Sequence, residues 1–453
     1  WARLMHSMSV GSRSLVRGQV LTALGGAAAI PMTTRVLFPR AAGRLRRRVA
    51  EMLLPRPRTM LRSAREADEA AAQSERGKLL GFSLTEKVDR ATSMLQGLGL
   101  VEKFAPLIVV LGHGSTSLNN PHESAHDCGA CGGRRGGPNA RLFAEMLNRP
   151  EVREGLRARG IDIPDTTWFI GGMHDTASDA IPLYDLDRVP AHATKELEAL
   201  KRVLDRARAL DAHERCRRFE AAPRNGTPEQ ALRHVEARSE HLAEPRPEYG
   251  HATNAVCIVG RRSLTRGLFL DRRAFLVSYD PTSDPDTRIL ERTLAAVGPV
   301  GAGINLEYYF SFVDNERYGC GTKLPHNITG LLGVMNGHAS DLRTGLPWQM
   351  VEVHEPVRLL TIVDATPEQL LTVAERQPVV RELVVKRWIQ LVSLDPETGA
   401  MKVFGDQGFV PYAPDVKQLP VVRSSVDWYR GHLEHLAPAR IDSREKAMIH
   451  AAR

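Results

Sequence analysis

The hydrophobic positions change their period near residue 105, where an expected helix gives way to an expected strand. Upstream, apolar side chains recur at helical spacing, at Val88, Ala91, Leu95 and Leu98. Ser83 and Glu86 precede them with the spacing of a capping box, so we expect the helix to begin there. Beyond Pro106, residues 107–111 form an unbroken apolar run. Such a run is typical of a strand buried on both faces of a parallel sheet.

The pattern then returns to helical spacing and again to a strand. Residues 139–148 predict one helix, and residues 152–159 predict a second that ends at Gly160. Residues 167–170 are β-branched or aromatic, as in a strand. A strand, two helices and a strand over this length form a βαβ unit, so the two strands should be parallel.

Helices and short strands alternate in the rest of the chain. A charged amphipathic helix is expected over residues 194–221, and another from Thr227, an N-cap followed by proline. Past a proline-rich boundary at residues 244–248, strand-like runs occupy residues 256–259, 275–279 and 359–363. We therefore predict an α/β protein with four regions: a basic helical segment and linker (1–80), a βαβ region (81–190), a helical insertion (191–245) and a C-terminal α/β region (246–453).

The charge distribution and the first residues of the sequence each lead to a further expectation. The net charge is +8, with many arginines between residues 40 and 65. They form either a solvated helix or a surface that faces anionic lipid or a partner, and no nucleic-acid-binding module accompanies them. No signal peptide is recognisable, no run reaches the ~20 apolar residues of a membrane span, and the chain starts at Trp1. We expect it to begin inside a longer protein.

The cysteines indicate a reducing compartment and one site of interest. There are five, an odd number in a long chain without a signal sequence, which argues against a disulfide framework. Cys128 and Cys131 form a C-x-x-C pair in a glycine-rich stretch that follows the strand at residues 107–111. His113 stands at the carboxyl end of that strand, where ligands gather in α/β sheets. A cysteine thiolate and a neutral imidazole are good zinc ligands, so His113 and Cys128 are candidates for metal binding.

Zinc needs four ligands, or three and a water, and the residues leave several readings open. Local candidates for the remaining positions are Cys131, His126, His122 and Asp127. The C-x-x-C pair also allows a thiol redox module, a local structural zinc knuckle, or inert buried cysteines beside a satisfied histidine.

Other polar and aromatic residues are weaker candidates. His174 and Asp175 follow the strand at residues 167–170, at the same sheet edge as His113. They either face the substrate or form a helix-capping aspartate beside a satisfied histidine. Loop-orienting roles or ordinary turn chemistry are open for Asn119, Asn120 and Glu123. We expect the aromatic run at residues 308–312 to pack in the core or at an interface.

Two resemblances make the picture specific. Gly112-His113 followed by Cys128-Gly129 resembles the zinc-binding motif of β-carbonic anhydrases, with a longer insertion. The surrounding stretch closely resembles the family of probable inorganic carbon transporter subunits DabA, and so does NLEYYFSFVDNERYGCGTKLPHNITGLLGVMNGHASD, residues 305–341. This likeness covers roughly residues 80–430. It implies a β-carbonic-anhydrase-like parallel sheet, with residues 81–190 as half of a zinc site.

The DabA resemblance implies a function, a cofactor and partners. It implies a zinc subunit that hydrates CO2 to bicarbonate in an energy-coupled, vectorial manner, at the cytoplasmic face of the inner membrane. Its partner would be an integral, proton-channel-like membrane subunit of the DabB type. His113 and Cys128 match the family's second pair of zinc ligands, whereas the first pair belongs to a Cys-x-Asp-x-Arg motif that no cysteine of this chain matches. A non-enzymatic, zinc-stabilised scaffold that docks on the membrane partner is the alternative.

Overall fold

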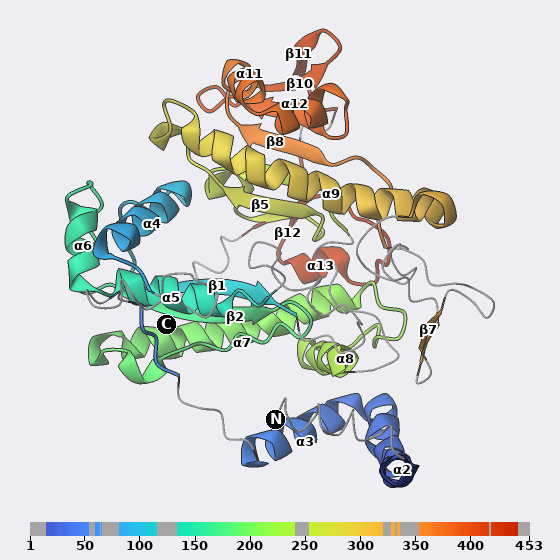
Figure 1. Cartoon of the computed structure of the whole chain (residues 1–453). Coiled ribbons are helices and arrows are strands. Elements are labelled where there is room, and N and C mark those ends of the chain that lie inside the picture. Colours follow the sequence, from blue (N-terminus) through green and yellow to red (C-terminus); the bar gives the residue numbers. More distant parts are fainter. Residues whose placement is uncertain are drawn as a thin grey trace.

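A computed structural model of the chain describes residues 15–53, 59–63, 65, 81–115, 134–240, 253–319, 328–330, 333–335, 353–415 and 418–442. In these residues, helices pack around two principal sheets that contain parallel strands, so the fold is mixed α/β. Figure 1 shows the smaller sheet in the middle of the molecule and the larger sheet at one end. The boundary expected at residues 244–248 lies outside the described residues.

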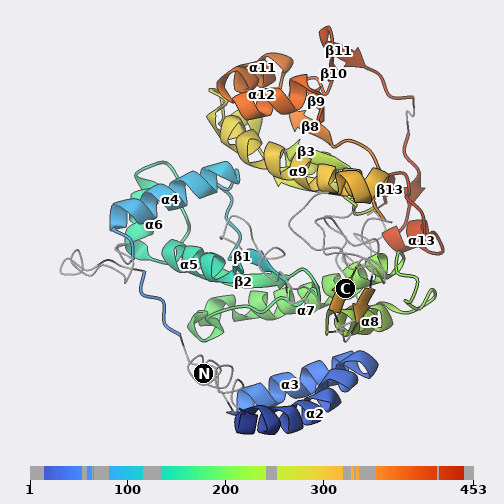
Figure 2. The same cartoon turned by 45° about the vertical axis from the view of Figure 1, so that its right-hand side comes forward.

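The basic N-terminal region is helical, as expected, and its two described helices form a hairpin. Helices α2 (Leu15–Leu37) and α3 (Pro39–Leu53) pack against each other, and α3 packs against α8 (Pro228–Glu240). Both views place the hairpin at the outer edge of the molecule (Figures 1 and 2). Among the described residues, no helix is both long and apolar enough to pass through a bilayer.

The predicted βαβ unit is confirmed. Strands β1 (Leu107–Gly114) and β2 (Trp168–Asp175) pair in parallel, and helices α5 (Gly137–Leu147) and α6 (Pro150–Arg157) connect them. Helix α4 (Leu84–Gly97) precedes β1 and begins with the predicted capping box. The apolar faces of α4, α5 and α6 meet over the strands in one core, which includes Leu95, Phe143, Leu147, Leu156 and Phe169.

The burial expected for the first strand is wrong. Residues 107–111 are only half-buried or exposed, and the side chain of Leu111 is 41% exposed. The reason is the size of the sheet, because β2 is the one described strand that pairs with β1. Helix α5 covers one face of this pair, and both views show α7 (Thr194–Cys216) along the other side (Figures 1 and 2).

Helices α7 and α8 confirm the two helices predicted over residues 194–221 and from Thr227, although α7 already ends at Cys216. Thr227 caps the second helix: its hydroxyl accepts a hydrogen bond from the Gln230 amide, and the Gln230 side chain accepts one from the Thr227 amide. The two helices pack against each other and enclose a small core with Cys216, Phe219, Val235 and Tyr308. Tyr308 comes from the predicted aromatic run, which therefore reaches the core.

The larger sheet has six strands in the order β11-β10-β9-β8-β3-β5. Their bounds are β3 Val256–Gly260, β5 Ala274–Ser278, β8 Leu360–Asp364, β9 Gln390–Leu394, β10 Met401–Gly405 and β11 Gly408–Tyr412. Strands β5, β3, β8 and β9 run parallel to one another, and β10 and β11 continue the sheet as an antiparallel meander. The three predicted strands at residues 256–259, 275–279 and 359–363 are thus confirmed.

Three helices cover one face of the larger sheet. They are α9 (Arg288–Tyr318), α11 (Pro367–Arg376) and α12 (Pro378–Val385). Leu290, Leu359 and Val363 are almost fully enclosed in the core between helices and strands. The described residues also contain two small sheets. One consists of β12 (Val421–Val422), β13 (Ala439–Ile441) and β4 (Leu268–Phe269) and lies next to α13 (Ser425–Tyr429). The other is a hairpin of β6 (Ile328–Gly330) and β7 (Gly333–Met335).

Candidate functional site

The carboxyl ends of β1 and β2 bring two histidines to one sheet edge. In the parallel register His113 is opposite His174, and Gly114 is opposite Asp175. Paired residues of neighbouring strands present their side chains on the same face of a sheet. The side chain of His113 is exposed, and that of His174 is half-exposed. The sequence correctly placed these residues together at this edge.

Close backbone packing fixes the surroundings of His113. The Gly136 amide donates a hydrogen bond of 2.7 Å to the His113 carbonyl, so the segment that enters α5 crosses the end of β1. A Cβ atom on Gly112 would lie 2.2 Å from the Gly136 backbone, so this crossing requires a glycine. The described residues just before residue 116 and just after residue 133 therefore lie close to each other, beside His113.

An open cavity of about 960 Å³ borders this edge. It lies between α4, β1 and α5, and His113 and Gly136 are part of its wall. Most of the lining is apolar, and the charged members Glu86, Asp89 and Arg90 come from α4. His113 therefore borders an open and mostly apolar cavity.

His174 is oriented by a buried carboxylate. Its Nε2 lies 2.9 Å from Oδ1 of Asp179, which is itself almost completely buried. Asp175 accepts hydrogen bonds from the Ala177 amide (3.0 Å) and the Ser178 hydroxyl (2.8 Å). Two details of the prediction are corrected here: both residues belong to β2 instead of following it, and Asp175 caps a turn where a helix cap was expected, because no helix starts at residue 176.

A buried charge network extends from Asp179 into α7. Arg215, which is 1% exposed, pairs with Asp179 and lies 3.6 Å from Asp211. Arg272, in the turn before β5, pairs with the other oxygen of Asp211. Burial raises the pKa of Asp179. Burial also acts to raise the pKa of Asp211, but Arg272 and Arg215 outweigh it and leave that pKa lowered.

The same network holds the smaller sheet to the larger one. Its members come from the turn after β2, from α7 and from the turn before β5. Asp179, Asp271 and Arg272 all have left-handed backbone conformations, with φ of 55°, 53° and 55°. Such a conformation costs about 1 kcal/mol for a residue other than glycine, so the surrounding contacts must hold these side chains in place.

Glu214 is the member whose charge changes near neutral pH. Burial raises the pKa of its carboxyl from 4.5 to about 7. The positive charge of Arg272 lowers this pKa, and the negative charge of Asp211 raises it further. The described charges that face it also include Arg217 and Asp271. Sequence reasoning missed this network, since Asp179, Arg215 and Arg272 are far apart in the chain.

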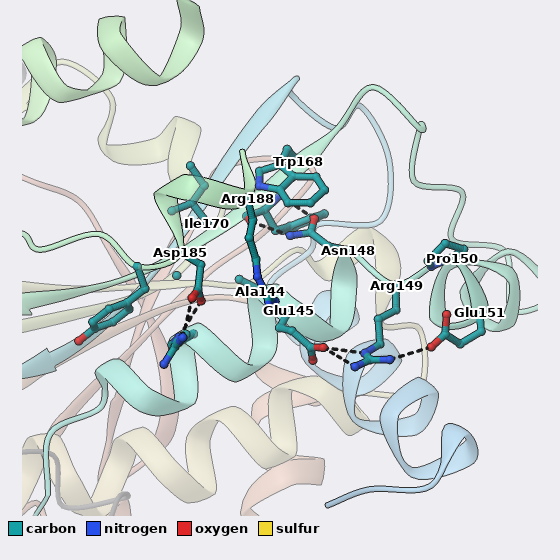
Figure 3. A pocket seen from close by; sticks show the side chains of 14 residues that line it. Ala144, Glu145, Asn148, Arg149, Pro150, Glu151, Trp168, Ile170, Asp185 and Arg188 are labelled. Carbon is teal, nitrogen blue, oxygen red and sulfur yellow. Dashed lines mark hydrogen bonds and ion pairs between the residues drawn. The ribbon is translucent and has the colours of Figure 1, made fainter. Parts of the chain in front are cut away.

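A second, smaller cavity of about 240 Å³ lies at the opposite end of β2 (Figure 3). Its charged side chains largely neutralise each other. Arg141 binds Asp185 through both carboxylate oxygens, and Arg149 bridges Glu145 and Glu151. With these pairs satisfied, the cavity has no strong preference for an anion or a cation.

The described thiols and metal ligands restrict where chemistry can occur. Cys216 and Cys257 are buried free thiols, and burial raises the pKa of each to about 11, so neither is a reactive nucleophile. No group of three or more potential metal ligands occurs within the part of the chain that the structure describes. The remaining predicted site residues lie outside the described residues: Asn119, Asn120, His122, Glu123, His126, Asp127, Cys128 and Cys131.

Fold and site define an α/β protein with a histidine at the carboxyl edge of a parallel strand pair. The comparison with protein families names the class. Residues 1–389 match the family model "Probable inorganic carbon transporter subunit DabA", and the chain belongs to this family. No solved structure matches the chain significantly.

Individual relatives agree with this assignment. The chain is 58% identical over 442 residues to "Probable inorganic carbon transporter subunit DabA 1" of Sorangium cellulosum, covering 97% of this chain and 43% of that protein. It is 52% identical over 414 residues to "Probable inorganic carbon transporter subunit DabA" of Methylococcus capsulatus, covering 91% of this chain and 38% of that protein. The chain thus spans less than half the length of these curated relatives.

Proposed function

We propose that this chain supplies His113 and Cys128 as two ligands of a zinc ion in an inorganic carbon transporter subunit that hydrates CO2 to bicarbonate. The observation that carries the proposal is the hydrogen bond from the Gly136 amide to the carbonyl of the exposed His113, which places the described residues that follow the segment containing Cys128 beside those that precede it. An imidazole and a thiolate suit zinc, and Gly112 lets the backbone close around the histidine.

The donor set of this chain is incomplete, as the family resemblance implies. Zinc takes four ligands, and the family's other pair belongs to a Cys-x-Asp-x-Arg motif that no cysteine of this chain matches. When bound, zinc lowers the pKa of a coordinated water to about 7. The chain's own contribution would be to orient His113 and to place His174, held by Asp179, on the same side of the sheet facing the substrate.

A larger β-carbonic-anhydrase-like sheet is part of this proposal. The outer edge of β2 is occupied by the segment at residues 180–184, whose carbonyls accept hydrogen bonds from Met173 and Asp175. The outer edge of β1 pairs with no described strand. Further parallel strands would extend the sheet from β1, on the side of His113. A membrane subunit of the DabB type, at the cytoplasmic face of the inner membrane, would couple the hydration to transport.

Zinc content, measured by elemental analysis, tests the proposal. The protein should be prepared in a form that also includes the family's Cys-x-Asp-x-Arg motif, unchanged and as His113→Ala and Cys128→Ala. We expect about one zinc per chain, lost in both variants, while His432→Ala, which replaces an exposed histidine near the C-terminal end, retains it.

The other results select other functions. If the His113→Ala variant keeps its zinc, the proposed site is wrong, and a cysteine zinc knuckle or a redox pair is favoured. Zinc lost with His113, without any acceleration of CO2 hydration in the unchanged protein, would favour the scaffold that docks on the membrane subunit.

A further inference from the structure

Helix α3 exposes a row of large apolar side chains. Leu45, Val49 and Met52 are 64%, 39% and 74% exposed. Their spacing of four and three residues puts them on one face of the helix. Phe38, just before α3, and Leu53, at its end, extend this face and are equally open to solvent. We name the five residues Phe38, Leu45, Val49, Met52 and Leu53 the apolar stripe.

The opposite face of α3 is firmly attached to the protein, which fixes the orientation of the stripe. Arg40 donates a 2.6 Å hydrogen bond to Glu236 of α8, and Arg47 pairs with Glu240. Gly43 is buried between them, and a Cβ atom there would lie 2.4 Å from the Glu240 side chain. The helix therefore cannot turn to bury the stripe without giving up this contact.

Arginines border the stripe on both sides. Arg44 and Arg48, one turn apart, lie along one flank and are exposed. Arg46 lies on the other flank, where it reaches Glu240 at 3.3 Å while about half of its side chain stays in solvent. An apolar helix face bordered by cations is complementary to the surface of an anionic lipid bilayer, where negatively charged head groups lie above an apolar interior.

We propose that α3 is an interfacial helix that lies on an anionic lipid surface, with the apolar stripe in the acyl boundary and its bordering arginines on the phosphates. Apolar burial and electrostatic attraction act together in such binding, and each weakens if the other is removed. This inference goes beyond the proposed carbon chemistry and does not depend on zinc. It adds a direct contact with lipid to any contact with a membrane partner.

Vesicle co-sedimentation of the 453-residue chain tests the inference. One set of vesicles contains phosphatidylglycerol and phosphatidylcholine, and the other contains phosphatidylcholine alone. We expect binding to the first set, at least about tenfold stronger than to the second, and a decline as salt rises. Replacing Leu45 and Met52 together (Leu45→Glu, Met52→Glu) should weaken binding at least about tenfold.

Charge variants and a matched control separate the contributions. Arg44→Gln and Arg48→Gln should each lower the binding constant about fivefold. Val203→Glu places the same charge at a 63% exposed valine of α7, outside the hairpin, and should leave binding unchanged. In a Met52→Trp variant, the added fluorescence should shift to the blue with anionic vesicles if the stripe enters the lipid.

Three results would overturn the inference. The first is equal binding to both kinds of vesicle, and the second is binding that the stripe variants do not change. The third is a dimer in light scattering that Leu45→Glu dissociates, which would assign the stripe to a second copy of the chain. Because the substituted side chains are exposed, circular dichroism should show unchanged folding in every variant.

Discussion

The two sheets of this protein end in opposite ways at their carboxyl edges. In the smaller sheet, His113 is exposed beside an open cavity, and glycine lets the backbone cross next to it. In the larger sheet, Asp364 at the end of β8 is fully buried under Arg261, whose Nε and Nη2 donate hydrogen bonds of 2.7 and 3.0 Å to its carboxylate. The smaller sheet leaves polar groups available for chemistry, whereas the larger sheet uses them to close its own end.

Removal of the arginine at the junction of the sheets should have the largest effect. Arg215→Leu leaves the buried Asp179 carboxylate without its cation, although Asp211 keeps Arg272, and we expect a loss of about 3–5 kcal/mol in the free energy of unfolding. Urea unfolding followed by circular dichroism measures this loss. Arg206→Leu, at an exposed position of the same helix, should change stability by less than about 0.5 kcal/mol. A small effect at both positions would show that the junction does not depend on this network.

The second largest loss of stability is expected for a substitution in the apolar core of the larger sheet. Leu290→Ala opens a cavity beneath α9 in a fully buried position, and we expect a loss of about 3 kcal/mol. The matched control is Leu371→Ala, because Leu371 is 45% exposed on α11. Hydrogen exchange would locate the change: amides of β3 and β8 should lose protection, whereas those of β1 should not. Equal loss in both sheets would mean that they unfold as one unit.

The ionisation of Glu214 should make the stability of the folded protein depend on pH. Its pKa in the folded protein, about 7, lies above the ordinary value of 4.5, so the folded state holds this proton more tightly than the unfolded chain does. The resulting stabilisation is complete below about pH 4.5 and is lost as the pH rises through 7. Between pH 5 and 7 we expect a fall of about 2 kcal/mol that Glu214→Gln abolishes. Urea midpoints at both pH values would measure it, and an identical fall in the variant would exclude Glu214 as its source.

The smallest predicted effect concerns the crossing beside His113. Gly112→Ala puts a methyl group against the Gly136 backbone, which cannot move aside as a flexible side chain would. We expect a loss of about 1–2 kcal/mol, with faster hydrogen exchange in β1 but not in β3. Gly25→Ala in α2 has open space around it and should be neutral or slightly stabilising. A neutral Gly112→Ala would mean that the crossing is loose.

Local sequence signals predicted much of the smaller sheet and its helices. Ser83 and Thr227 each act as the N-cap that their spacing indicated, and the βαβ unit has parallel strands. The position of His113 at the sheet edge follows from the strand prediction alone. Binding of zinc by His113 and Cys128 stays a prediction.

Tertiary packing decided what the sequence did not reveal. Helix α9 contains Pro299 and several glycines, which weaken a helix locally, yet burial against the larger sheet keeps it helical up to the kink at Asp314. The apolar run of β1 looked like a central strand, but with one described neighbour it stays half-buried. The charge network joins Asp179 to Arg215 and Asp211 to Arg272 across long sequence separations, for which no local pattern exists.

The hydrogen bond between Gly136 and His113 has a consequence for how the sequence can diverge. It joins the described residues that precede segment 116–133 to those that follow it, so the placement of α5 against β1 is set by this contact. In general, the entropic penalty for lengthening a flexible connection between two fixed points is small, about 0.6 kcal/mol for a doubling of its length. The length of chain between β1 and α5 can therefore vary among related sequences at a small cost in stability, provided that the proposed zinc ligand Cys128 is kept.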